Sequence, residues 1–84
     1  MKIKYTLKFK SICPSDKDII DYKAIIHSNG RDFTLVEDMK KFVENFEKEE
    51  HFQEDITQLL ADQFQGKVVT YGTHQGVKIK CVIK

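Results

Sequence analysis

The chain opens on a strict alternation of apolar and polar side chains. Apolar residues occupy every second position of residues 2–10, with lysines or a threonine between them. Because successive side chains of a strand point to opposite faces, this period of two predicts a half-buried strand. The apolar row consists of Ile3, Tyr5, Leu7 and Phe9. A cluster of β-branched and aromatic residues predicts a second strand from about Ile20 to Ser28, after a loop at residues 11–19 and before a turn at residues 29–32.

Apolar residues then recur at helical spacing in two stretches. Thr34 followed by Glu37 is a capping-box pattern, which predicts that a first helix begins there and ends near residues 48–50. Its apolar residues are Leu35, Met39, Phe42, Val43 and Phe46. A second helix is expected to begin at residues 52–54, with Gly66 just past its end as the stop, since glycine readily adopts the backbone conformation that terminates helices. It would bury Ile56, Leu59, Leu60 and Phe64.

The last part of the chain again has the strand period. Residues 67–71 are predicted to form a third strand, residues 72–76 a connection and residues 77–84 a fourth strand with Cys81 in its inward row, as a core residue. The predicted order is β-β-α-α-β-β. Each element has one apolar face, so the pattern predicts an α+β fold of two layers, with two antiparallel helices on one face of a four-stranded antiparallel sheet. Lysines would line the other face.

Length and charge add two expectations. A chain of 84 residues is expected to form one domain, residues 1–84, and is short for a self-sufficient core, so we expect it to associate as a homo-oligomer. Positive and negative charges are separated along the chain, although the net charge is only +1. Residues 34–66 carry nine acids and three lysines, a net charge of −6, and the other residues carry a net charge of +7. No apolar run approaches the roughly 18 residues of a membrane span and no signal-peptide core is present, which predicts a cytoplasmic protein with free thiols.

Few residues stand out as candidates for chemistry. Cys13 lies in a polar loop beside a proline, where a thiolate could be presented to a ligand, although a free cysteine is more often a small buried hydrophobe. Asp21 opens a strand, where aspartate is disfavoured, and this suggests a role for it. Asp16 and Asp18 are interpreted as solvated turn residues. The histidines have no spacing typical of a zinc site, so no metal is predicted.

Four short motifs, taken in order, resemble the pattern of a known family. They are Ser11-Ile12-Cys13-Pro14, Asp21-Tyr22, Leu35-Val36-Glu37 and Phe52-Gln53-Glu54-Asp55. The chain in this respect resembles the QueF family of 7-cyano-7-deazaguanine enzymes, which belong to the tunnelling-fold superfamily, and the resemblance covers residues 11–84. It implies a tunnelling fold (T-fold), whose β-β-α-α-β-β layout agrees with the one predicted above.

The resemblance also implies roles for individual residues. Cys13 would attack the nitrile carbon to form a covalent thioimide, and Asp21 would handle the protons. Glu54 would accept hydrogen bonds from the guanine-like edge of the substrate, and Phe52 would lie against the heterocycle. Gln53 and Glu37, in the matching motifs, would belong to the substrate-binding site as well. Gln53 departs from the family pattern, which has a histidine there, and the interval from Cys13 to Asp21 is one residue longer than expected, so Asp18 is an alternative to Asp21.

The second substrate decides between members of this family. Reductases carry a Ser/Lys-rich motif associated with NADPH after the Val-Glu pair, and residues 37–42 of this chain lack it. The chain looks closer to the QueF-like amidinotransferases, archaeosine synthases that act with ammonia on tRNA bearing the 7-cyano base and need no cofactor. This resemblance implies a ring or stacked rings with sites shared between subunits, and the lysine face could contact the tRNA. An NADPH-dependent nitrile reductase and a non-catalytic module that binds a nucleobase or a protein remain the alternatives.

Overall fold

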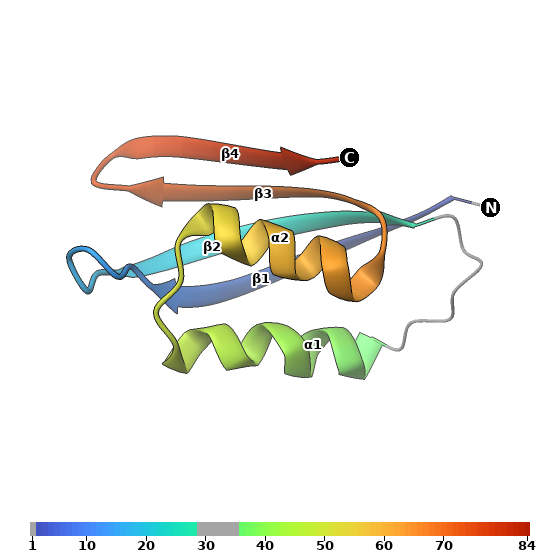
Figure 1. Cartoon of the computed structure of the whole chain (residues 1–84), viewed down its shortest axis with the longest axis horizontal. Helices are drawn as coiled ribbons and strands as arrows, with labels where there is room; N and C mark the ends of the chain where they lie inside the picture. The colour runs from blue at the N-terminus through green and yellow to red at the C-terminus, as the bar shows by residue number, and fades with distance from the viewer. Residues whose placement is uncertain (1, 29–35) are drawn as a thin grey trace.

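A computed structural model of the chain describes residues 2–28 and 36–84. Its elements are β1 (Ile3–Ile12), β2 (Ile19–Ser28), α1 (Val36–Glu44), the 3-10 helix η1 (Asn45–Lys48), α2 (Gln53–Phe64), β3 (Lys67–His74) and β4 (Val77–Ile83). The strands form one antiparallel sheet in the order β1-β2-β3-β4, and both helices cover the same face of it (Figure 1). The predicted α+β fold with the order β-β-α-α-β-β is therefore confirmed. The turn predicted at residues 29–32, and Thr34 and Leu35 of the first helix, lie outside the described residues.

The core lies between the sheet and the helices. Apolar side chains of β1 and β2 that face the helices are buried or partly buried, while the alternate positions of these strands are mostly exposed, as the period of two predicts. The rings of Phe9 and Tyr22 stack with centroids 5.6 Å apart, and Phe46 packs against Phe9 at the same distance. The cluster of buried residues consists of Phe9, Cys13, Ile20, Tyr22, Ala24, Ile26, Met39, Val43, Phe46, Ile56, Leu60 and Val68.

The two helices run in opposite directions along the sheet, as expected (Figure 1). The rings of Phe42 and Phe64 meet edge to face at 5.4 Å and join them. Leu59, predicted to be buried, is 40% exposed. The buried stripe of α2 passes through positions 53, 56, 57 and 60, and position 59 lies off that stripe. No helix among the described residues is long and apolar enough to cross a membrane.

Several ends differ from the predictions. Helix α2 ends at Phe64, and Gln65 rather than Gly66 takes the left-handed conformation that terminates it, with φ of 48° and its N–H donating to the carbonyl oxygen of Ala61. Cys81, predicted to be a core residue, is only partly buried. It lies on an edge strand, which has a neighbouring strand on one side only, and Val77 of the same strand is 60% exposed.

The hairpin of β3 and β4 is tighter than predicted. The connection expected at residues 72–76 shrinks to Gln75 and Gly76, whose φ angles are 51° and 80°. Two central residues with positive φ are typical of the type I′ turn, whose twist matches that of the flanking strands. Strand β3 therefore continues to His74 and carries this side chain to the end of the sheet.

Candidate functional site

The loop that carries Cys13 is a tight, hydrogen-bonded turn between β1 and β2. The N–H of Cys13 donates to the carbonyl oxygen of Asp18 at 2.8 Å, and the N–H of Lys17 donates to the carbonyl oxygen of Cys13 at 2.9 Å. Lys17 has a φ of 64°, which reverses the chain. Cys13 continues the inward register of Phe9 and Ser11, so its side chain lies on the helix-covered side and is 6% exposed.

Three side chains meet at this end of the sheet. The sulfur of Cys13, a carboxylate oxygen of Asp16 and a ring nitrogen of His74 all lie within 4.8 Å of one another. Nε2 of His74 is 2.5 Å from Oδ2 of Asp16, and Nε2 of Gln75 donates to the same oxygen at 2.9 Å. The thiol of Cys13 is also 3.1 Å from the hydroxyl of Ser15. The loop between β1 and β2 and the hairpin of β3 and β4 thus contribute to one cluster, Cys13–Asp16–His74.

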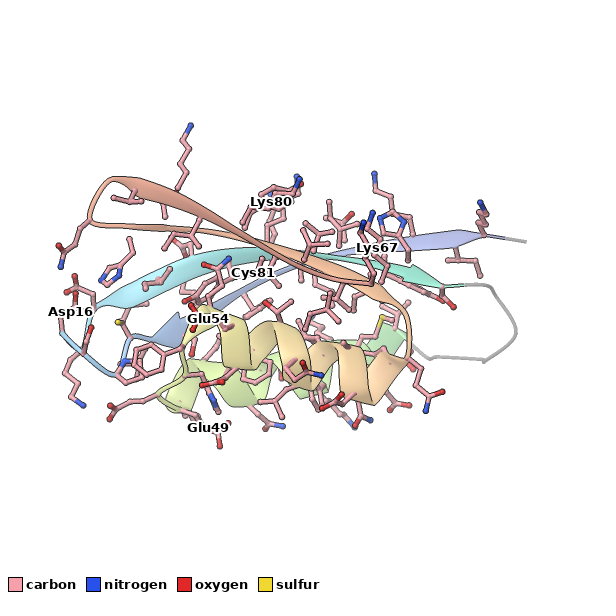
Figure 2. The ribbon with its side chains drawn as sticks, turned by 45° about the horizontal axis from the view of Figure 1, so that its top comes forward. Asp16, Glu49, Glu54, Lys67, Lys80 and Cys81 are labelled. Carbon is pink, nitrogen blue, oxygen red and sulfur yellow. The ribbon has the colours of Figure 1, made fainter. Side chains whose placement is uncertain are left out.

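Asp16 is held as an anion in this cluster. The backbone N–H of Asp18 donates to its Oδ1 at 3.0 Å, and this bond, followed by the contact with His74, holds the pKa of the Asp16 carboxyl well below its usual range. Asp16 is an exposed turn residue, as interpreted from the sequence, but its carboxylate also accepts contacts from His74 and Gln75 of the other hairpin. Figure 2 shows Asp16 at the end of the molecule where the two hairpins meet.

Tyr22 lies beneath the site, in the core. Burial, and then the negative charges of Cys13, Cys81 and Glu54, raise the pKa of Tyr22 to about 12. The phenol therefore stays neutral across the physiological range.

The segment before α2 runs alongside the end of β1. The N–H of Ile12 donates to the carbonyl oxygen of Glu49 at 3.3 Å, and the N–H of His51 donates to the carbonyl oxygen of Ile12 at 3.1 Å. The hydroxyl of Ser11 donates to the same Glu49 carbonyl at 3.1 Å. These bonds fix the start of α2 next to the Cys13 loop, which places the Phe52-Gln53-Glu54 motif at this end of the molecule.

The residues of this motif differ in their surroundings. Glu54 is exposed in the first turn of α2, and Phe52 is 48% exposed, so both are available to a ligand. Gln53 is buried, and its amide nitrogen lies 3.1–3.2 Å from Thr70 Oγ1 and from the carbonyl oxygens of Thr70 and Ile79. Gln53 therefore ties α2 to β3 and β4.

Glu37 and Asp21 lie away from Cys13 within the chain. Glu37 is exposed in the first turn of α1, and α1 begins at the end of the molecule opposite the Cys13 loop (Figure 1). Asp21 alternates with Tyr22 and so faces the open side of the sheet, where its carboxylate is 84% exposed and lies 3.8 Å from Nζ of Lys10. One chain alone does not bring either of these two residues to Cys13, and their roles stay predictions.

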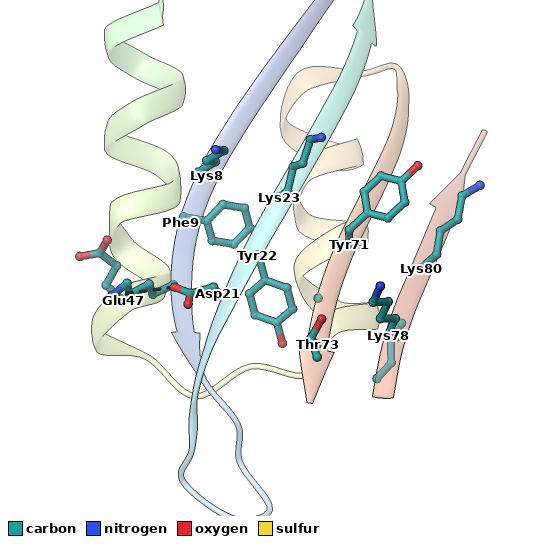
Figure 3. Close-up of a pocket in the computed structure, with 13 residues that line it drawn as sticks. Lys8, Phe9, Asp21, Tyr22, Lys23, Glu47, Tyr71, Thr73, Lys78 and Lys80 are labelled. Atoms are coloured by element: carbon teal, nitrogen blue, oxygen red, sulfur yellow. Dashed lines mark ion pairs between the residues drawn. The ribbon is translucent and has the colours of Figure 1, made fainter. Parts of the chain in front are cut away.

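Asp21 instead lines a groove of about 710 Å³ on the open face of the sheet. Figure 3 shows Lys8, Lys23, Tyr71 and Lys80 side by side across the four strands, and Nζ of Lys80 lies 5.9 Å from the centre of the Tyr71 ring. The charged residues of the groove are Lys8, Lys10, Lys23, Lys78, Lys80, Asp21 and Glu47. The predicted lysine face is therefore present and concave.

Comparison with known proteins supports the fold. No family model and no curated protein sequence matches the chain. A solved structure does match: the crystal structure of the archaeosine synthase QueF-Like in the apo form, at a TM-score of 0.84 and 18% sequence identity. The similarity covers 98% of this chain and 90% of that one. The chain has the fold of that protein, the tunnelling fold. The fold predicted from the resemblance is thereby confirmed for this chain.

Sequence reasoning missed two members of the cluster. Asp16 lies in an Asp-x-Asp sequence, which is typical of a turn. In an Asx turn the carboxylate accepts a hydrogen bond from the N–H two residues later, as Asp16 does here from Asp18, so the motif indicates a local role only. His74 precedes Gln75-Gly76, and recognising the tight turn would have placed it on a strand. Nothing in the sequence says that the two hairpin ends meet.

Proposed function

We propose that this QueF-like tunnelling-fold protein is an amidinotransferase that converts the nitrile of 7-cyano-7-deazaguanine in tRNA to an amidine with ammonia. The observation that carries the proposal is the Cys13–Asp16–His74 cluster, in which a buried thiol lies beside a carboxylate and an imidazole. The fold of an archaeosine synthase supports the same reaction class. A cysteine with an acid–base pair in reach is the arrangement that nucleophilic catalysis needs.

The chemistry would proceed in two additions. The sulfur of Cys13 attacks the nitrile carbon, and the nitrile nitrogen takes up the thiol proton, which gives a thioimide. Ammonia then attacks the same carbon, the C–S bond breaks and Cys13 leaves as the thiol, so the amidine forms without a redox step. In this scheme the Asp16–His74 pair holds and returns the proton, because an imidazole beside a carboxylate is suited to this at neutral pH.

The substrate would lie between the Cys13 loop and the start of α2. Glu54 would accept two parallel hydrogen bonds from the N–H groups of the guanine-like edge, and the exposed ring of Phe52 would stack on the heterocycle. A ring without these donors would leave the carboxylate unpaired and would bind weakly. Gln53 would keep Glu54 and Phe52 in place through its bonds to β3 and β4.

Residues of a second copy would complete the site in this proposal. Strands β1 and β4 are the two edges of the sheet, and edge strands offer unpaired backbone groups to another chain. A ring built through these edges would bring Asp21 and Glu37 of one subunit toward another. The lysines of the groove would contact the tRNA backbone.

Intact mass spectrometry tests the first step. Incubation with free 7-cyano-7-deazaguanine should add the mass of the base to the wild type and to Cys81→Ala, and should leave Cys13→Ala unmodified. We expect His74→Gln to slow adduct formation by about 100-fold, with His51→Gln as the matched control. An unmodified wild-type chain would favour the non-catalytic binding module.

A second measurement identifies the other reactant. The wild type should form the amidine from ammonia and tRNA bearing the 7-cyano base. Normal binding of this tRNA without amidine formation would exclude the amidinotransferase. Consumption of NADPH with the free base would establish the nitrile reductase instead.

A further inference from the structure

We propose that Cys13, Asp16 and His74 form a zinc-binding site, and that a bound ion withdraws the Cys13 thiolate from the nitrile. The second part of this inference rests on the proposed function, whereas the binding of the ion does not. The three donor atoms lie within 4.8 Å of one another and come from two separate hairpins.

The donor set fits zinc chemically. Thiolates, carboxylate oxygens and imidazole nitrogens are all common zinc ligands. The thiolate and the carboxylate together carry a charge of about −2, which balances the charge of Zn²⁺, and the imidazole is neutral. Tetrahedral coordination at ordinary zinc–ligand lengths places neighbouring donors about 3.4–3.6 Å apart. The His74–Asp16 contact of 2.5 Å would open by about 1 Å, and the sulfur would remain within its present distance.

The surroundings orient the ligands in advance. The backbone N–H of Asp18 binds Oδ1 of Asp16, which leaves Oδ2 directed at His74, and Gln75 donates to that oxygen. Partners of this kind typically contribute about 10- to 100-fold to metal affinity. The nearest lysine of the loop, Lys17, is paired with Glu50, so its positive charge is neutralised.

Three protein ligands would leave a fourth position for water or another small donor, as in zinc sites that are not purely structural. Such a site is incompatible with free attack by Cys13, because the lone pair that would attack the nitrile is shared with the ion. Zinc and the nitrile would therefore compete for one sulfur atom.

Cobalt(II) is a direct probe of the binding site. Titration of untagged, metal-free protein with Co²⁺ should produce a thiolate-to-cobalt charge-transfer band that saturates at one ion per chain. Zn²⁺ should abolish the band by displacement. Cys13→Ser should lack the band, whereas Cys81→Ser, which removes the other free thiol, should keep it.

Two further variants keep the thiol and report on the other ligands. Asp16→Asn and His74→Gln should each weaken zinc binding at least about tenfold in calorimetric titration, while Asp18→Asn and His51→Gln should not. Circular dichroism establishes that each variant is folded. A charge-transfer band that survives Cys13→Ser, or equal zinc affinity in all four variants, would overturn the site.

Competition is measured through the covalent adduct. Saturating Zn²⁺ should suppress addition of the 7-cyano base to wild type by at least about tenfold, and a chelator should restore it. Adduct formation that zinc does not change would refute the competition. Absence of the adduct even from metal-free protein would sink the proposed function, and the cobalt spectrum would still decide the metal site.

Discussion

Gly72 is the position where the ring of Tyr22 comes closest to the backbone of β3. A methyl group built on Gly72 would lie 2.6 Å from Cε1 of Tyr22 and 3.1 Å from Oε1 of Gln53. Real carbon atoms do not approach that closely in a packed interior, so a side chain at residue 72 would have to displace the tyrosine. The position of Tyr22 under the site therefore depends on the absence of one side chain.

Gly72→Ala should lower the free energy of unfolding by roughly 1–3 kcal/mol, because the added methyl group forces the Tyr22 ring out of its packed position. Urea denaturation of wild type and variant measures this loss. The same substitution in a Tyr22→Leu background, which removes the ring edge, should cost less. Equal losses in the two backgrounds would show that the ring is not the cause.

Tyr22 also predicts how stability changes with alkaline pH. Its pKa of about 12 in the folded chain lies above the value of about 10 of an unfolded tyrosine, because burial favours the neutral phenol. The stabilisation is complete below pH 10 and is lost between about pH 10 and pH 12. Relative to Tyr22→Phe, the wild type should lose roughly 2 kcal/mol over this interval, measured by urea denaturation at several pH values. Tyr71→Phe, at an exposed position, serves as the control, and identical alkaline slopes for wild type and Tyr22→Phe would refute the prediction.

Some residues of the site could be predicted from the sequence and others could not. The loop around Cys13 and the motif from Phe52 to Glu54 could be chosen from local sequence and family resemblance. The partners of Cys13 could not, because Asp16 and His74 are 58 positions apart and their contact depends on how two hairpins end. Asp21 was chosen for its unusual place in a strand, but the alternation of the same strand turns it to the open face.

Helix α2 is terminated by Gln65 and not by the expected glycine, Gly66. Gln65 takes the left-handed conformation at the end of the helix, and Gly66 follows it. A side chain in this conformation costs about 1 kcal/mol relative to glycine, whereas the N–H to Ala61 bond is made by the backbone and would persist.

Gln65→Gly should accordingly raise the free energy of unfolding by about 0.5–1 kcal/mol, which thermal and urea denaturation can detect. Gln63→Gly, two positions earlier and still inside the helix, is the matched control and should destabilise by about 1 kcal/mol. Two losses of the same size would mean that the conformation of Gln65 carries no strain.

The spacing of apolar residues predicted the helices and strands themselves better than the residues at which they begin and end. The alternation of β1 and the stripe of α2 set which faces are buried, and the structure follows them. The ends depend on backbone angles of single residues, such as Gln75, which supplies a positive φ that sequence rules assign mainly to glycine and asparagine. The type I′ turn was missed for this reason, and with it the length of β3.

At the scale of the whole molecule, charge is divided between the two layers. The segment that contains both helices carries the net charge of −6, while lysines of β1, β2 and β4 line the groove on the open face. This division was readable from the sequence, because the lysines alternate with the apolar residues that face the helices. The groove on this face was not predicted.

Lys8→Gln combined with Lys23→Gln should weaken binding of unmodified tRNA and reduce the slope of log affinity against log salt by about 1 for each lysine that contacts a phosphate. Filter binding or fluorescence anisotropy at several salt concentrations measures the slope. Lys40→Gln combined with Lys41→Gln removes the same charge from the exposed side of α1 and should change the slope less. If both pairs have the same effect, binding follows net charge and not the groove.

The Cys13–Asp16–His74 cluster forms only when the ends of the two hairpins meet during folding. Asp16 and His74 are separated by 58 positions, so their contact closes a loop that spans most of the chain, at an entropic cost that only the folded elements between them repay. A chain still leaving the ribosome has no imidazole beside Cys13 until His74 has been made and the two hairpins have met. A truncated or half-folded chain would therefore keep Ser15 and Asp16 close to Cys13 in sequence but would lack the imidazole that the proposed proton transfer requires.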